Sequence, residues 1–316
     1  MTSQTAPANG IGTPRVTILL ATYNGAPYLN AQLASYAAQK DVDWDLWVSD
    51  DGSQDETQAI IAAFQKQQAG RHDIRVLTGP GRGSAANFMH LLTHPDLPTD
   101  RPVALSDQDD VWHPGKLARA LSVLSNLAPL TLYGAQSIHT DADLTPIGQS
   151  RMPTRAPSFC NALVQNIVSG HSTVMPPAVV ELVRQAGVPA DIPYHDWWLY
   201  QLVTGAGGHV HIDDARTIDY RQHRQNVMGA HAGLRASLVR IGQVLGHSYG
   251  DWVATNMQAL GRVRTLLTPE NQSVLDAING APKGLLRAAA LSRLGIYRQS
   301  RAGTASLYAA AALGRV

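Results

Sequence analysis

Residues 16–25 read VTILLATYNG, an uninterrupted apolar and β-branched run at 16–21 that ends in a polar turn. A run of this kind predicts a strand that is buried on both faces of a parallel sheet. Pro27 then opens a segment with apolar residues at helical spacing, which predicts a helix over residues 28–39. The chain is therefore expected to begin with a strand–turn–helix unit, after a polar tail at 1–13 that we expect to be flexible.

The same kind of unit recurs three more times in the first 125 residues. Its predicted positions are strands at 45–48, 74–77 and 102–105, and helices at 57–67, at 84–92 and from near Pro114. Residues 53–56 form a capping-box pattern before the second helix, and Ser84 is placed to cap the third. Four such units predict an α/β fold with a doubly wound, mostly parallel central sheet.

After residue 130 the pattern becomes less regular and then purely helical. Strands are predicted at 130–134 and 208–212, and helices at 178–185, 197–203, 234–245, 252–267, 271–278, 285–294 and 306–313. The only plausible boundary lies near residues 228–230. We therefore expect a flexible tail at 1–13, an α/β domain at 14–228 and a C-terminal helical region at 229–316.

Composition narrows the class of protein. The 316 residues carry 25 basic and 24 acidic side chains, so a net charge of +1 provides no global field that would recruit nucleic acid. A single cysteine excludes an internal disulfide. The apolar runs fall far short of the ~20 residues that span a bilayer, and the N-terminus lacks a basic-then-apolar signal region. We expect a cytoplasmic enzyme.

Polar residues gather where the predicted strands end, at residues 22–25, 49–53 and 106–112. In open parallel sheets, ligands bind beyond the carboxyl ends of the strands. Each segment alone is equally consistent with an ordinary turn, since Asn-Gly, Asp-Gly and Ser are common turn residues.

The acidic run at 107–110 is more informative. Three carboxylates, Asp107, Asp109 and Asp110, repel one another at the end of an apolar strand, and a divalent cation such as Mg²⁺ or Mn²⁺ would relieve this repulsion. The alternative is that Asp109 or Asp110 merely caps a helix at Trp112.

Taken together and in this order, the three strand-exit motifs ATYNG (21–25), VSDDGS (48–53) and SDQDDVW (106–112) resemble family 2 glycosyltransferases of the GT-A fold. The motif DQDDVW at 107–112, followed by Pro114 and Lys116, is most similar to rhamnosyltransferase-type members that build bacterial surface polysaccharides. The resemblance covers about residues 14–228. It implies the GT-A fold with a C-terminal helical appendage, and sugar transfer from a nucleotide-diphosphate donor.

The resemblance also assigns expected roles to individual residues. The residues that it implies for binding the donor nucleotide are Thr22, Tyr23, Asn24, Asp50, Asp51, Asn87, Asp107 and Arg221. Asp109 and His223 are the implied metal ligands. Asp196 is the implied catalytic base, because an inverting transferase needs one base to take the proton of the acceptor hydroxyl. Its alternative role is to cap a helix that begins at Trp197.

The acceptor site is implied less directly. Gly170 and His171 fall where the family has an acceptor-facing loop, and Trp197 and Trp198 offer faces on which a sugar could stack. A plain turn at 169–172, and two core tryptophans, are the alternatives.

Basic residues are spread through the C-terminal helical region. Basic amphipathic helices can lie on anionic membranes, which would place the enzyme at the inner face of the cell membrane beside a lipid-linked acceptor. Solvated arginines or a homodimer contact are the alternatives.

These inferences lead to one predicted function and two rivals. We expect an inverting, metal-dependent glycosyltransferase that moves a sugar, with L-rhamnose from dTDP-rhamnose as the first choice and a UDP-sugar as the alternative donor. The expected acceptor is a hydroxyl of a growing surface polysaccharide or lipid-linked glycan. A nucleotidyltransferase shares the sheet but needs a Gly-rich loop with Arg and Lys after the first strand, which this sequence lacks. A non-catalytic homologue that binds nucleotide sugar or glycan would not need an intact Asp107, Asp109, Asp196 and His223.

Overall fold

The computed structural model describes residues 13–189, 191–223 and 247–316. Most of the predicted tail at 1–13, the predicted helix at 234–245 and the boundary near 228–230 lie outside these residues. Within the described ranges, no helix combines the length and the hydropathy needed to cross a membrane.

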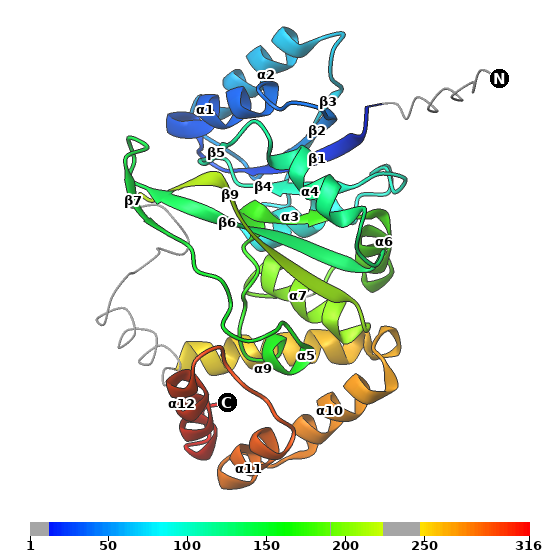
Figure 1. Cartoon of the computed structure of the whole chain (residues 1–316), viewed down its shortest axis with the longest axis vertical. Helices are drawn as coiled ribbons and strands as arrows, with labels where there is room; N and C mark the ends of the chain where they lie inside the picture. Colours follow the sequence, from blue (N-terminus) through cyan, green and yellow to red (C-terminus); the bar gives the residue numbers. More distant parts are fainter. Residues whose placement is uncertain (1–12, 190, 224–246) are drawn as a thin grey trace, which may run out of the picture.

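One mixed sheet forms the centre of the molecule, with strands in the order β3-β2-β1-β4-β8-β6-β9-β5 and β7 paired to β6 (Figure 1). The strands are β1 (Arg15–Thr22), β2 (Asp43–Asp50), β3 (Ile74–Thr78), β4 (Val103–Ser106), β5 (Val111–Trp112), β6 (Thr131–Thr140), β7 (Pro146–Gln149), β8 (Val174–Met175) and β9 (His209–Arg221). The pairs β1–β2, β2–β3, β1–β4 and β6–β9 are parallel. β8 runs antiparallel to both β4 and β6. The predicted α/β class with a mostly parallel sheet is confirmed.

Helices surround the sheet and continue beyond it. They are α1 (Ala26–Ala37), α2 (Thr57–Gln68), α3 (Ser84–Leu92), α4 (Lys116–Leu124), α5 (Phe159–Ala162), η1 (Gly170–Ser172), α6 (Pro177–Ala186), α7 (His195–Gly205), α9 (His247–Arg262), η2 (Arg264–Leu266), α10 (Pro269–Gly280), α11 (Leu285–Arg293) and α12 (Arg301–Ala312). Helices α9 to α12 lie together at the end of the molecule opposite α1 and α2 (Figure 1). The prediction of a helical C-terminal part is therefore correct for the described residues.

Two apolar clusters hold the sheet from its two faces. Leu19 and Leu105 belong to one cluster, and their strand neighbours Ile18, Leu20 and Ala104 belong to the other. Alternate residues of a strand point to opposite faces, so a strand covered on both sides must be apolar throughout. This is why the runs at 16–21 and 103–105 are continuous.

The strand register brings the polar exits together. Thr22 pairs with Asp50 across β1–β2, and Leu20 pairs with Ser106 across β1–β4. The three predicted ligand-binding turns therefore leave the sheet at the same edge.

Two local predictions were wrong, and one alternative is excluded. Ser53 does not cap α2, because its hydroxyl donates to Asp50 Oδ1 and the N-cap position belongs to Glu56. Ser84 is the first residue of α3, and Gly83 precedes it with a φ of +84°. Trp112 begins no helix, because it lies in β5 and pairs with β9.

Candidate active site

Tyr23 and Gln108 join the exits of β1 and β4. The side-chain amide of Gln108 accepts a hydrogen bond from Tyr23 N at 2.9 Å and donates one to Tyr23 O at 3.0 Å. The neighbouring Gly25 leaves room for this pair, because a Cβ atom there would overlap Gln108 Oε1. Tyr23 remains 57% exposed. The acidic motif thus fixes the turn that was expected to line the nucleotide pocket, and leaves an aromatic ring open beside it.

Asp50 is buried and fully engaged by its own chain. Its carboxylate accepts hydrogen bonds from Thr22 Oγ1 at 2.9 Å, from Ser53 N at 3.1 Å, from Ser53 Oγ at 2.5 Å and from Gln58 Nε2 at 2.8 Å. Burial alone would raise the pKa of Asp50, but these hydrogen bonds outweigh it and hold the pKa below the usual range. Asp50 therefore connects β1, the turn after β2 and α2 in this structure. Its oxygens are occupied by these contacts, whereas the resemblance had assigned Asp50 to binding the donor nucleotide.

Asp51 holds the glycine-rich loop that follows β3. Its two carboxylate oxygens accept hydrogen bonds from Gly81 N at 2.6 Å and from Gly83 N at 2.7 Å. Asn87 stands behind this loop on α3, is 2% exposed, and donates to Ser49 O at 2.9 Å. Both residues thus shape the wall of the site at the exit of β2. Asn24 joins the same wall, since its side chain accepts from Gln54 N at 2.8 Å.

The end of β9 returns to the acidic motif. His223 Nε2 lies 2.8 Å from Asp109 Oδ2, so the two predicted metal ligands are brought together. Arg221 is 5% exposed and donates from its side-chain Nε to Asp109 O at 2.8 Å and from its backbone N to Asp110 Oδ1 at 3.0 Å. Tyr28 stacks on His223 with ring centroids 4.6 Å apart, and the Arg221 guanidinium lies 4.7 Å from the centre of the same ring.

A second possible arrangement of cation ligands lies within the same motif. Ligand atoms of Asp107, Asp110 and His171 fall within 4.8 Å of one another. Within the described part of the chain, Asp110 Oδ2 and His171 Nε2 are buried without a hydrogen-bond partner. Buried polar atoms without partners are costly, and a hard cation prefers carboxylate oxygens. These residues therefore fit a divalent metal. His171 was predicted to face an acceptor, but it is 7% exposed and stacks on Tyr220 at 4.6 Å.

Burial and like charges act strongly on this cluster. Burial, followed by the charges of Asp109 and Asp196, raises the pKa of Asp107 to about 8. Lys116 is 1% exposed, and its Nζ lies 3.6 Å from the centre of the Trp112 ring. Burial lowers the pKa of Lys116 to about 7, and the charge of Asp110 opposes this. A cation beside the carboxylates would relieve the repulsion that the sequence predicted.

Asp196 occupies the first turn of α7, with Tyr194 at the N-cap position. The alternative that Asp196 caps a helix starting at Trp197 is therefore wrong. Asp196 Oδ2 accepts from Gly170 N at 3.1 Å, and Oδ1 accepts from Trp197 N at 2.7 Å. Burial raises the pKa of Asp196 to about 6, although these hydrogen bonds act in the opposite direction. The carboxylate is thus held in a fixed position, near enough to Asp107 for its charge to affect that residue.

Gly170 has a local role in holding Asp196. A Cβ atom at residue 170 would lie 2.6 Å from His195 Nε2, so glycine allows the loop to approach α7 and donate its N–H. His195 itself is 8% exposed and stacks on Phe88 at 4.0 Å. Gly170 therefore helps to hold the predicted base in position, a role that the sequence did not reveal.

The two tryptophans of α7 do not form a sugar-stacking surface. Trp197 is 4% exposed and donates from Nε1 to Ala162 O at 2.6 Å, and Trp198 is 0% exposed. Both rings belong to an apolar cluster with residues of α3 and α6. The expectation that they stack a sugar is wrong in this structure, because core packing covers both faces.

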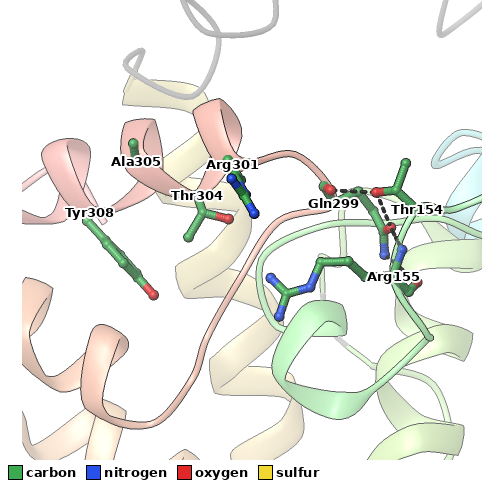
Figure 2. Close-up of a pocket in the computed structure, with 7 residues that line it drawn as sticks. All are labelled: Thr154, Arg155, Gln299, Arg301, Thr304, Ala305 and Tyr308. Atoms are coloured by element: carbon green, nitrogen blue, oxygen red, sulfur yellow. Dashed lines mark hydrogen bonds between the residues drawn. The ribbon is translucent and has the colours of Figure 1, made fainter.

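A separate hollow of about 710 Å³ lies between α12 and the chain at residues 154–155 (Figure 2). Thr154 Oγ1 donates to Gln299 O at 2.6 Å at its edge. Two arginines, Arg155 and Arg301, line it, and among the residues that the structure describes no carboxylate does. It therefore offers no ligand for a divalent cation and shares no residue with the strand-end site.

Comparison with known proteins agrees with this geometry. Residues 17–180 match the model of Glycosyl transferase family 2, and the chain belongs to that family. It is 28% identical to the dTDP-rhamnosyl transferase RfbG of Shigella flexneri over 246 residues. The matched region covers 76% of this chain and 84% of RfbG. It is also 26% identical over 160 residues to the UDP-Glc:alpha-D-GlcNAc-diphosphoundecaprenol beta-1,3-glucosyltransferase WfgD of Escherichia coli, covering 51% of this chain and 59% of WfgD.

Solved structures show the same fold. The mannosyltransferase PcManGT of Pyrobaculum calidifontis, in complex with GDP-Man and Mn²⁺, superposes with a TM-score of 0.55 at 18% identity, covering 96% of this chain and 88% of that one. S. aureus TarS 1–349 in complex with UDP-GlcNAc gives a TM-score of 0.54 at 13% identity, covering 89% of each chain. The chain is thus a family 2 glycosyltransferase with a GT-A fold.

Proposed function

We propose that this protein is an inverting, metal-dependent glycosyltransferase that transfers L-rhamnose from dTDP-rhamnose to a hydroxyl of a growing surface polysaccharide or lipid-linked glycan. The observation that carries the proposal is the place of Asp196. A carboxylate held by two backbone N–H groups lies beside the acidic motif, where burial, the charge of Asp109 and then the charge of Asp196 raise the pKa of Asp107. A base beside a cation-binding motif suits sugar transfer with inversion, because the base takes the acceptor proton and the cation would offset charge on the leaving diphosphate.

The donor would lie across the three strand exits. Tyr23 offers an exposed ring to a nucleobase, and Asp51 shapes the loop behind it. A divalent cation held by Asp109 with His223, or by the Asp107, Asp110 and His171 set, would offset negative charge on the departing diphosphate. The buried Arg221, already bonded to the acidic motif, adds a positive charge at the same place.

Asp196 would carry the proton transfer. Its carboxylate takes the proton of the acceptor hydroxyl while that oxygen forms a bond to the anomeric carbon. The bond from this carbon to the diphosphate oxygen breaks at the same time, and the nucleoside diphosphate leaves with that electron pair. Attack from the face opposite the leaving group inverts the configuration. One fixed base is sufficient, because the leaving diphosphate needs no proton.

Two relatives support the choice of substrates. The Shigella relative, whose match covers most of both chains, is a dTDP-rhamnosyl transferase. WfgD is named for a diphosphoundecaprenol-linked acceptor, which supports a lipid-linked glycan here.

A donor panel tests the proposal. The purified protein is incubated with dTDP-rhamnose, UDP-glucose, UDP-GlcNAc or GDP-mannose, with Mg²⁺, Mn²⁺ or EDTA, and slow release of nucleoside diphosphate is measured. We expect cation-dependent hydrolysis that is fastest with dTDP-rhamnose and is lost in Asp109→Ala. Faster turnover of another donor would reject rhamnose while retaining the enzyme class.

Two further measurements distinguish the rival functions. Release of pyrophosphate from dTTP and a sugar phosphate would indicate a nucleotidyltransferase. Donor binding by calorimetry without turnover, even after addition of lipid-linked acceptors, would indicate a non-catalytic binding protein.

A further inference from the structure

The three most exposed large apolar side chains of the described residues lie on one small part of the surface. Leu285 is 78% exposed, Leu313 65% and Leu286 64%. Leu285 and Leu286 begin α11, and Leu313 directly follows α12. A Cβ atom at Gly284 would lie 3.8 Å from Ala312 O, so the residues next to the leucines are neighbours in space. We call Leu285, Leu286 and Leu313 the leucine tip.

The leucine tip belongs to two helices that are otherwise well packed. Ala290 and Leu291 of α11 and Leu307, Ala310 and Ala311 of α12 are buried. These helices therefore already have an apolar face turned to the protein, and the exposed leucines are additional to it. Single exposed apolar residues are ordinary, but a group at one place marks a contact surface.

Charge identifies the partner. Residues 277–316 contain no aspartate or glutamate and six basic residues, namely Lys283, Arg287, Arg293, Arg298, Arg301 and Arg315. A basic residue lies within two positions of each leucine of the tip. Three exposed leucines, each with a basic residue close to it in the sequence, match an anionic bilayer, where apolar side chains enter the acyl boundary and basic ones meet lipid phosphates.

The position of the tip agrees with such a contact. Helix α11 lies at one end of the long axis of the molecule, with α1 and α2 at the other end (Figure 1). A projecting end can touch a flat surface without hindrance from the sheet domain. We propose that the leucine tip docks this protein on an anionic membrane surface. This deepens the proposed function, since it would place the enzyme beside a lipid-linked acceptor, but it is tested without any turnover.

The experiment measures co-sedimentation of the full chain with vesicles. We expect binding to phosphatidylcholine vesicles that contain phosphatidylglycerol, weak binding to pure phosphatidylcholine, and loss of binding as salt is raised. Leu285→Ser/Leu286→Ser/Leu313→Ser should lower the partition coefficient by more than about tenfold. Lys283→Glu/Arg293→Glu, which changes two exposed basic residues, should remove the preference for phosphatidylglycerol.

A matched control separates docking from general stickiness. Ile147→Ser/Val188→Ser changes two apolar residues that are 57% and 61% exposed outside the C-terminal helices, and it should bind vesicles like the unchanged protein. Equal binding by the leucine variant, or no binding by the unchanged protein, would overturn the proposal. Sedimentation velocity tests whether a second copy of this chain binds the leucine tip instead. A dimer that the leucine variant converts to a monomer would show that the tip is a subunit contact instead.

Discussion

Asp109 and His223 are 114 positions apart in the chain, and yet His223 Nε2 lies 2.8 Å from Asp109 Oδ2. The side chains of both are largely buried, at 16% and 10% exposure. Residue 109 follows β4 and residue 223 follows β9, so the two strands must both be in place before this pair exists.

Asp109→Asn should weaken cation-dependent donor binding. The amide keeps the size of the side chain but removes the negative charge, so we expect affinity for Mn²⁺ in the presence of nucleotide to fall by more than about tenfold. Calorimetry with and without Mn²⁺ measures this. The control is Asp214→Asn, since that side chain is 83% exposed. Unchanged cation dependence in Asp109→Asn would assign the cation to Asp107, Asp110 and His171 instead.

Asp196→Asn should stop transfer without loss of the donor. An amide cannot take the acceptor proton, so kcat should fall by a factor of about 10²–10⁴. Asparagine can still accept one of the two backbone hydrogen bonds that now reach Asp196, so we expect the variant to fold. Donor affinity from calorimetry should stay within about twofold. Near-normal turnover would leave Asp196 with a structural role only.

The rate of transfer should depend on pH through Asp196. Burial raises the pKa of this carboxyl to about 6, so the base is protonated and inactive below pH 6 and becomes ionised above it. The rate should therefore rise with pH, by about tenfold per unit below pH 6, and level off above it. A pH profile of kcat/KM tests this, and the residual activity of Asp196→Asn should lack the rise. A profile that falls from pH 5 to 7 is incompatible with this base.

Gly25→Ala and Gln108→Ala should damage the same contact. A Cβ atom at residue 25 displaces the Gln108 amide from Tyr23, and the second variant removes that amide outright. Each should lower the free energy of unfolding by about 1–3 kcal/mol and weaken donor binding. Because both lose the same two hydrogen bonds, the double variant should be little worse than the worse single one. Full additivity in urea unfolding would show that the residues act separately.

The parallel part of the sheet could be predicted because its signal is local. Strands β1 and β4 are buried on both faces and show as nearly unbroken apolar runs, and the predicted bounds of β1 to β4 differ from the observed ones by two residues at most. The short strands β5, β7 and β8 were missed. They have two to four residues each, and pairing with distant strands is what makes them strands.

The site was predicted in part for a related reason. Acidic residues at strand ends, such as Asp109, are visible in the sequence, and the resemblance to a family added His223. The burial of individual side chains could not be predicted from the sequence. His171 and Trp198 looked available for an acceptor, but contacts from other elements cover them. Tyr28, which stacks on His223, gave no signal, because its spacing is that of an ordinary amphipathic helix.

The double hydrogen bond between Gln108 and Tyr23 also limits how this enzyme could be redesigned. Gln108, which separates Asp107 from Asp109, fixes the turn after β1, so the two segments form one unit although they are 85 positions apart. A graft of residues 22–25 from a relative with another donor would keep this contact only where it retains glycine at position 25, because a Cβ atom there would overlap Gln108 Oε1. Under the proposed function, a change of nucleotide preference that alters residue 25 would therefore need a matching change at residue 108.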